Sequence, residues 1–343
     1  MTLVTTKLDA WRSQVEDNKI DLHEDRFSNY GAFATYLKDT PNLIPGAAAF
    51  VEGRAGEDRT ASFTVINRET FSASSGRTCT AGTQDSTSAY VTPSWTTWQF
   101  AFKVVPSQYV NNYVSQAADM KHKMDTLERT ILYDLDTAAV TSLEANISLE
   151  NNASANPYNF AAGISAVPLT GNDYFLNELD SQMMYNNLGG LPINVIASPR
   201  FSTYVSKYTN QGPGNDENRT FQFGGKSFAY SNQITVATSD RDTVYAAPIG
   251  SLGFMRWIDP DAKANNKAGS GAEWFIQGLP RVGFDVGVLY ASTCADNSSK
   301  QSGLEASFTE SYSFSFDYVF TTAYNSTPST NPGSIFKYEL SKT

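Results

Sequence analysis

The sequence predicts an α+β fold, and three of its patterns support that prediction. The first is a segment near the C-terminus, Phe308 to Tyr324, in which aromatic side chains alternate with small polar ones. The second is a long run without glycine or proline, Ser107 to Asn156, whose apolar residues recur at helical spacing. The third is a short apolar strand followed directly by a helix start, Leu191 to Pro199. Together they predict sheets combined with one very long helix.

The composition indicates that the chain folds, and its charge argues against some classes of ligand. Of 343 residues, 41% are hydrophobic and 17% are charged, which excludes disorder, collagen and a pure coiled coil. The 25 Lys and Arg stand against 35 Asp and Glu, a formal net charge of −10. This balance disfavours tight binding of a phosphate backbone, although a container whose inner wall faces nucleic acid remains compatible with it.

Cysteine usage and the N-terminus indicate a reducing compartment and no membrane. The two cysteines, Cys79 and Cys294, are too few and too distant to suggest a disulfide framework. Residues Met1 to Ala10 lack the basic flank and apolar run of a signal peptide, and no segment approaches the ~18 apolar residues of a membrane span. We therefore expect neither export nor membrane embedding.

Residues 1–55 are predicted to form an N-terminal arm with short helices. Phe27 to Lys38 places Phe27, Phe33 and Leu37 at helical spacing. Pro41 and then Pro45-Gly46 are expected to stop this helix.

Residues 56–105 are predicted to form an extended loop. Arg59 to Ile66 and Trp98 to Val104 alternate apolar and polar residues and should be its strands. Most residues from Phe71 to Tyr90 are Ser, Thr, Gly or Ala, too poor in apolar side chains to bury the segment. We expect this part to project from the body.

Residues 106–190 are predicted to contain the long helix, with Ser107 as its N-cap after Pro106. A helix of roughly 35 residues would run about 50 Å, longer than a small domain is wide. It would be a spine that ties distant parts of a flat molecule together, unless it breaks in two or packs wholly inside its own core. Its predicted core face consists of Met120, Met124, Leu127, Ile131 and Leu135.

Residues 191–272 are predicted to form a separate α/β domain, and residues 273–343 a return to sheet with a C-terminal tail. The first of these opens with the strand Leu191 to Ala197 and a helix capped by Ser198 and Pro199. It ends in a polar loop, Asp259 to Gly271. In the second, the even-numbered aromatic residues from Phe308 to Phe320 should pack while Ser313, Asp317, Val319 and their neighbours on the odd positions meet water.

The sequence offers little chemistry. His23 and His122 are the only histidines, no zinc or Gly-x-Ser-x-Gly motif occurs, and Gly212-Pro213-Gly214 lacks the third glycine of a dinucleotide site. Trp95, Trp98, Trp257 and Trp274 could line a carbohydrate platform, but strand packing is the default for such residues. We predict no catalytic residue, no cofactor and no metal.

The order of these parts resembles the major capsid protein of tailed bacteriophages. In that family an N-arm is followed by an extended loop, by a spine helix in the peripheral domain and by an axial domain. The predicted arm, loop and long helix resemble the first three of these parts, and the segment Asn194 to Val205 (NVIASPRFSTYV) resembles the start of the axial domain. The chain then returns to a closing sheet. The resemblance implies a homo-oligomer of hexamers and pentamers in an icosahedral virion shell that encloses double-stranded DNA and assembles in the host bacterial cytoplasm. Inter-subunit contacts are expected in the loop, at Phe71, Arg77, Tyr90 and Trp95.

The resemblance also implies partners and two departures. A portal and a decoration protein are partners in this family, and a separate scaffolding protein is implied because only about fifty residues precede the loop. Lys103 is the only lysine between Arg54 and Val105, so isopeptide crosslinking of the shell is not expected. Two alternatives stay open, an encapsulin-like nanocompartment with the same fold and a monomeric β-rich binding or hydrolytic protein.

Overall fold

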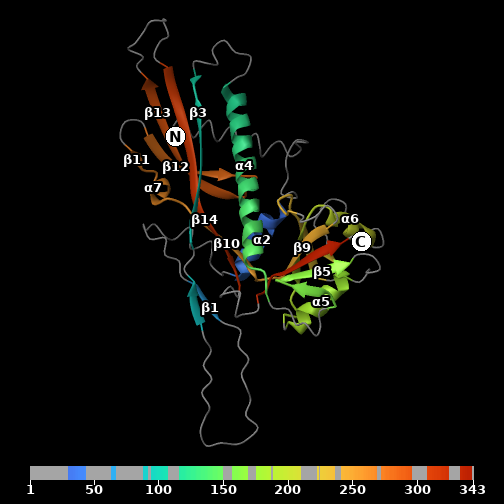
Figure 1. The fold of residues 1–343 in the computed structure, drawn as a ribbon. Helices are drawn as coiled ribbons and strands as arrows, with labels where there is room; N and C mark the ends of the chain where they lie inside the picture. Colours follow the sequence, from blue (N-terminus) through green and yellow to red (C-terminus); the bar gives the residue numbers. More distant parts are fainter. Residues whose placement is uncertain are drawn as a thin grey trace, which may run out of the picture.

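A computed structural model gives the arrangement of these parts (Figure 1). It describes residues 30–43, 63–66, 88–91, 94–106, 116–149, 157–168, 175–186, 188–209, 222–223, 225–235, 241–268, 272–295, 307–323 and 333–341. The helices within these ranges are α2 (Gly31–Leu43), α4 (Gln116–Ala145), α5 (Phe175–Tyr185), α6 (Phe201–Thr209) and α7 (Pro260–Lys263). None of them combines the length and apolar character needed to cross a membrane.

A long sheet of six antiparallel strands runs beside α4. Its order is β10-β14-β13-β12-β11, and β3 pairs with the free side of β14. The strands are β3 (Thr96–Val104), β10 (Leu252–Trp257), β11 (Lys267–Ala268), β12 (Ala272–Leu279), β13 (Phe284–Ala295) and β14 (Ser307–Thr322). The 16-residue β14 is the central strand of this sheet, because three other strands pair with it.

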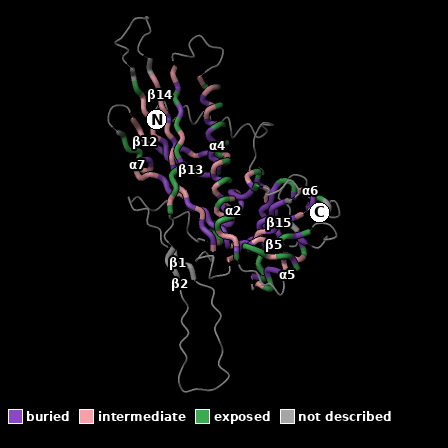
Figure 2. Tube along the Cα trace, in the orientation of Figure 1, coloured by how far each residue is buried: buried purple, intermediate pink, exposed green. Residues whose placement is uncertain are grey.

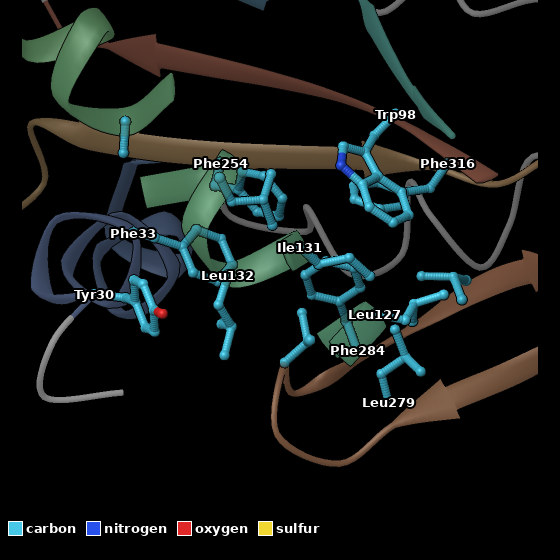
Figure 3. Packing of buried hydrophobic residues seen from close by; sticks show 14 of the residues in the cluster. Tyr30, Phe33, Trp98, Leu127, Ile131, Leu132, Phe254, Leu279, Phe284 and Phe316 are labelled. Atoms are coloured by element: carbon cyan, nitrogen blue, oxygen red, sulfur yellow. The ribbon is translucent and has the colours of Figure 1, made fainter. Parts of the chain in front are cut away.

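One face of the six-stranded sheet packs against α4 and α2 and forms a first hydrophobic core. In the register of the sheet, Phe102 of β3 and Tyr290 of β13 both lie opposite Tyr312 of β14. These side chains and those at alternate positions of the neighbouring strands are buried together with the inner face of α4. Figure 3 shows part of this core, where Phe33 of α2 lies edge-on against Phe254 of β10 at 5.2 Å between ring centroids.

The opposite face of β14 is partly exposed to solvent at one end only. The prediction that all its odd-numbered residues meet water is therefore wrong for the other end. Ser313 and Ser315 are half-buried as expected, but Asp317 and Val319 are buried. Asp317 lies opposite Trp257 and Val319 opposite Met255 of β10, so two large side chains share their face. Thr97 also donates a hydrogen bond of 2.6 Å from its Oγ1 to Oδ1 of Asp317.

A second sheet has seven strands and mixed directions, in the order β4-β5-β15-β9-β6-β8-β7. Its pairs β5 with β15 and β6 with β8 are parallel. The strands are β4 (Asn159–Ala161), β5 (Ile164–Pro168), β6 (Ile193–Ala197), β7 (Gln222–Phe223), β8 (Lys226–Tyr230), β9 (Arg241–Pro248) and β15 (Phe336–Ser341). Together with α5 and α6 it forms the α/β module beside the lower end of α4 (Figure 1).

The central strands of the α/β module are buried on both faces. Every residue of β6 is buried. Val195 faces α5 and α6 in a second hydrophobic core, whereas Ile196 belongs to the first core with α2 and α4. On β9, Val244 likewise lies in the second core and Tyr245 in the first. The module is therefore a sheet between two helical layers, which is typical of sheets with parallel strands.

The sheets cross the predicted domain boundaries. The segment 157–185, expected in the peripheral domain, and β15, expected in the C-terminal tail, both belong to the α/β module. Strand β10, expected in the axial domain, pairs with β14 in the six-stranded sheet. The reason is that strand pairing joins segments far apart in sequence, which local patterns do not encode.

Two local predictions were wrong. Helix α2 continues through Pro41 to Leu43, and its last turn is fixed on β10 by hydrogen bonds from the backbone N–H groups of Leu252 to Asp39 and of Phe254 to Thr40, at 2.9 and 2.8 Å. The polar loop predicted from Asp259 contains α7 and β11 instead. The side chain of Asp259 caps α7 by accepting from the backbone N–H of Asp261.

Candidate assembly surfaces

The described residues contain no metal-binding cluster. No three His, Cys, Asp or Glu side chains come together as metal ligands within the described ranges. His122 is exposed on α4, as a solvated helix face would have it. Trp98 and Trp257 are buried and Trp274 is half-buried, so packing accounts for these three indoles.

Helix α4 packs against residues of both sheets. Met120, Met124, Leu127, Ile131 and Leu135 are all buried and lie in the first core. The described helix starts at Gln116, and the predicted N-cap at Ser107 lies outside the described residues. Figure 2 shows buried and exposed positions alternating along α4, as expected of a helix packed on one side.

Acidic residues of α4 fasten it to the six-stranded sheet at one end. Arg281, in the turn between β12 and β13, donates from its Nη1 to Oδ1 of Asp125 at 3.1 Å. Its backbone N–H donates to Oε1 of the fully buried Glu128 at 3.2 Å. Further along, Nε1 of Trp98 on β3 donates to Oδ2 of Asp134 at 2.9 Å.

At its other end α4 is fastened to the α/β module. Glu144 accepts hydrogen bonds of 2.6 Å from the hydroxyl of Tyr245 on β9 and from Nζ of Lys337 on β15. Partial burial alone would raise the pKa of Glu144, but the hydrogen bonds from Lys337 and Tyr245 and the charge of Lys337 hold it below its ordinary value. Hence α4 connects the two sheets through polar contacts as well as through its apolar face.

Sequence reasoning missed these carboxylates because it followed only the apolar stripe. A signal was present: Glu128 and Asp136 fall beside Leu127, Leu132 and Leu135, on the face that must be buried. A charged residue inside an apolar stripe needs a partner, so it points to a fixed tertiary contact.

The hairpin of β1 (Phe63–Ile66) and β2 (Ser88–Val91) stands apart from both sheets. Its strands pair antiparallel, with Thr64 opposite Tyr90, and form a two-stranded sheet of their own. Figure 1 shows it below the body of the molecule. An isolated two-stranded hairpin is marginal in water, so such an element gains from contact with another surface.

The four residues predicted as loop contacts fall in different places. Tyr90 lies in β2, in the hairpin. Trp95 is half-buried just before β3 begins. Phe71 and Arg77 lie outside the described residues. Their role between subunits remains a prediction.

Three large apolar side chains are exposed at and just after the end of α5. Met184, Tyr185 and Leu191 are 64%, 57% and 52% exposed. Gly189 packs against Met184 so closely that a Cβ there would lie 2.7 Å from Met184 Cγ.

Comparison with known proteins shows what this architecture is similar to. No protein-family model matches the sequence, and neither does any curated protein. Among solved structures, the cyanophage Pam1 capsid is 8% identical, with 85% of this chain and 87% of that chain covered and a TM-score of 0.50. A structure from Mycobacterium phage Che8 is 10% identical, with 90% of each chain covered and a TM-score of 0.47.

The mature capsid of bacteriophage PhiM1 is 11% identical, with 83% of this chain and 82% of that chain covered and a TM-score of 0.46. At such low sequence identity, structural similarity indicates a shared fold and nothing more. The shared fold rests on the Pam1 capsid, which has the highest TM-score of these three structures. The chain therefore has the fold of a phage capsid protein, as its order of parts predicted.

Proposed function

We propose that this chain is the major capsid protein of a tailed bacteriophage, a structural subunit that assembles into hexamers and pentamers of an icosahedral head around double-stranded DNA. The observation that carries the proposal is the fold shared with the Pam1 capsid over most of both chains. A fold alone does not fix a function, so the surfaces and charge of this chain must support it as well.

Three features support a subunit that depends on its neighbours. The hairpin stands free of both sheets, apolar side chains are exposed at the end of α5, and α4 binds an elongated body into one piece. Closed homo-oligomers cover such surfaces with many modest contacts. The formal net charge of −10 also suits a wall that encloses DNA without binding it tightly.

The proposal extends to partners and location by the same resemblance. The shell would form on a separate scaffolding protein in the host cytoplasm, include a portal and become the wall of the virion. A decoration protein on its outside would be a further partner. Enzymatic activity forms no part of the proposed role.

Electron microscopy tests the proposal directly. We expect the chain, expressed alone or with the scaffolding protein of its phage, to form closed shells visible in negative stain. A monomer that stays monomeric at high concentration in both cases would contradict the proposal. Shells that enclose proteins and exclude duplex DNA in the native host would identify a nanocompartment instead.

The hairpin provides a second test of the same function. Deleting residues 72–87, beyond the ends of β1 and β2, should leave the thermal midpoint of the subunit nearly unchanged and prevent closed shells. A Gly/Ser linker of equal length in the same place separates the need for length from the need for the native side chains. Normal particles from both variants would remove the loop from the assembly mechanism.

A further inference from the structure

The carboxyl group of Asp136 is buried in the middle of the molecule. It lies on α4, and its residue has 0% exposure. Its Oδ1 accepts from the backbone N–H of Phe33 at 2.9 Å, and its Oδ2 accepts from the hydroxyl of Ser231. The backbone N–H of Ala32 is a third donor. The carboxyl therefore closes the N-terminal end of α2 from a different helix.

These donors bring together elements from both parts of the subunit. Helix α2 packs on β10 of the six-stranded sheet, while Ser231 directly follows β8 of the α/β module. Tyr30 forms an isolated β-bridge to Ser231, whose own backbone N–H donates to the carbonyl of Ala197 at the end of β6 at 3.0 Å. The Asp136 carboxyl thus lies where the two parts of the subunit meet.

No cation among the described residues forms an ion pair with this carboxyl. The charged and titratable groups on the elements around it have other partners or lie further along those elements. They are Tyr30 just before α2, Tyr36, Lys38 and Asp39 on α2, Lys226 and Tyr230 on β8, and Glu128, Arg129, Asp134 and Glu144 on α4. Lys226, for example, pairs with Asp180 at 2.5 Å, and Asp39 accepts from the backbone at Gly250 to Leu252. Strand β6 contributes no titratable side chain.

Burial without a cation favours the protonated carboxyl. Desolvation raises the pKa of Asp136 to about 6, although the hydrogen bonds from Ser231, Phe33 and Ala32 act in the opposite direction. The Ser231 hydroxyl suits either state, because a hydroxyl donates to a carboxylate and accepts from a carboxylic acid. It also accepts from the backbone N–H of Gln233 at 3.1 Å, which fixes its position.

We propose that Asp136 is a proton-dependent latch: protonation in mildly acidic solution removes a buried negative charge at the place where α4, α2 and the segment after β8 meet, and so stabilises the junction between the two parts of the subunit. The inference concerns the subunit itself and holds whether or not it assembles into shells.

The direction of the effect follows from proton linkage. The folded chain holds this proton more tightly than the unfolded chain, whose carboxyl keeps the ordinary pKa of 3.8. The stabilisation is therefore fully present below pH 3.8 and is lost as the pH rises through about 6. A difference of about two pKa units corresponds to a factor of about 100 in the unfolding equilibrium constant.

Denaturant unfolding of the full chain and of Asp136→Asn tests the latch. The amide mimics the neutral acid and cannot titrate. We expect the ratio of the unfolding equilibrium constants, wild type over variant, to rise by up to about 100-fold from pH 4 to pH 8, with its midpoint near pH 6. The matched control is Thr137→Asn on the exposed side of α4, for which the ratio should stay flat.

Two further measurements keep the latch testable if the asparagine variant does not fold. Ser231→Ala removes a hydrogen bond that lowers the pKa of Asp136, so the pH midpoint should move upward. In the wild type, amide hydrogen exchange around Phe33, corrected for its intrinsic pH dependence, should be slower at pH 5 than at pH 7.5, relative to amides of β14. A flat ratio for Asp136→Asn, or equal corrected protection at both pH values, would overturn the latch.

Discussion

The two sheets of this subunit are covered in different ways. The seven-stranded sheet lies between two layers of helices, and its central strand β6 is buried throughout. The six-stranded sheet has α4 and α2 on one face, while its other face is covered only in part: α7 packs on β12 and β13, and serines such as Ser311 and Ser313 are partly exposed. Figure 2 shows exposed positions running along this sheet, whereas buried ones dominate the α/β module.

The difference teaches where the subunit is self-sufficient. The α/β module buries one face of its sheet within its own core, under α5 and α6, whereas Ile196 and Tyr245 on the other face are covered by α2 and α4. The long sheet is packed on one face by α4 and α2 and carries only the short α7 on β12 and β13 besides, and the hairpin pairs with neither sheet. If the proposed function is right, assembly contacts should be concentrated on the open face of the long sheet, on the hairpin and at the exposed end of α5.

The largest expected effect comes from the helix on which the long sheet depends. Leu127→Asp places a charge without a partner in the first core, where Leu127 is fully buried, and should abolish soluble folding. Soluble yield and far-UV circular dichroism measure this. Thr126→Asp, one residue away on the exposed side, is the matched control and should fold normally. Soluble, folded Leu127→Asp protein would show that the long sheet does not depend on α4.

An intermediate effect is expected in the α/β module. Tyr338 on β15 is fully buried in the second core, and its hydroxyl donates to Oε1 of Gln182 on α5. Tyr338→Ala leaves a cavity and should cost about 3–5 kcal/mol of unfolding free energy. Tyr338→Phe keeps the ring and loses only the hydrogen bond, which should cost about 1–3 kcal/mol.

Hydrogen exchange then separates the two parts. In Tyr338→Ala, amides of α5 and β6 should exchange faster while those of β14 change little, because Tyr338 belongs to the second core and β14 to the first. If amide exchange in β14 became faster by the same factor, the two cores would unfold as one unit. The two sheets would then differ in how they are buried but not in their stability.

The same contrast explains how much the sequence could predict. Alternation along β14 and helical spacing along α4 are local patterns, and they identified the packed faces of both elements. Strand β15 was missed, because its place between β5 and β9 depends on partners at Ile164–Pro168 and Arg241–Pro248, far away in the chain. Asp136 was missed for the same reason, since its donors come from α2 and from Ser231. Phe71 and Arg77 remain predictions from composition.

The smallest effect is expected on the open face of the long sheet. Ser313 is half-buried, and its Oγ accepts a hydrogen bond of 3.0 Å from Nε2 of Gln99 at an exposed position across the strand pair. Because water can replace this contact, Ser313→Ala should change the unfolding free energy by no more than about 0.5 kcal/mol. Phe314→Ala, the next residue and fully buried, is the matched control and should cost about 3–5 kcal/mol. Denaturant unfolding measures both, and a loss above about 1 kcal/mol for Ser313→Ala would mean that this face is packed within the subunit, so that the long sheet is covered on both sides like its neighbour.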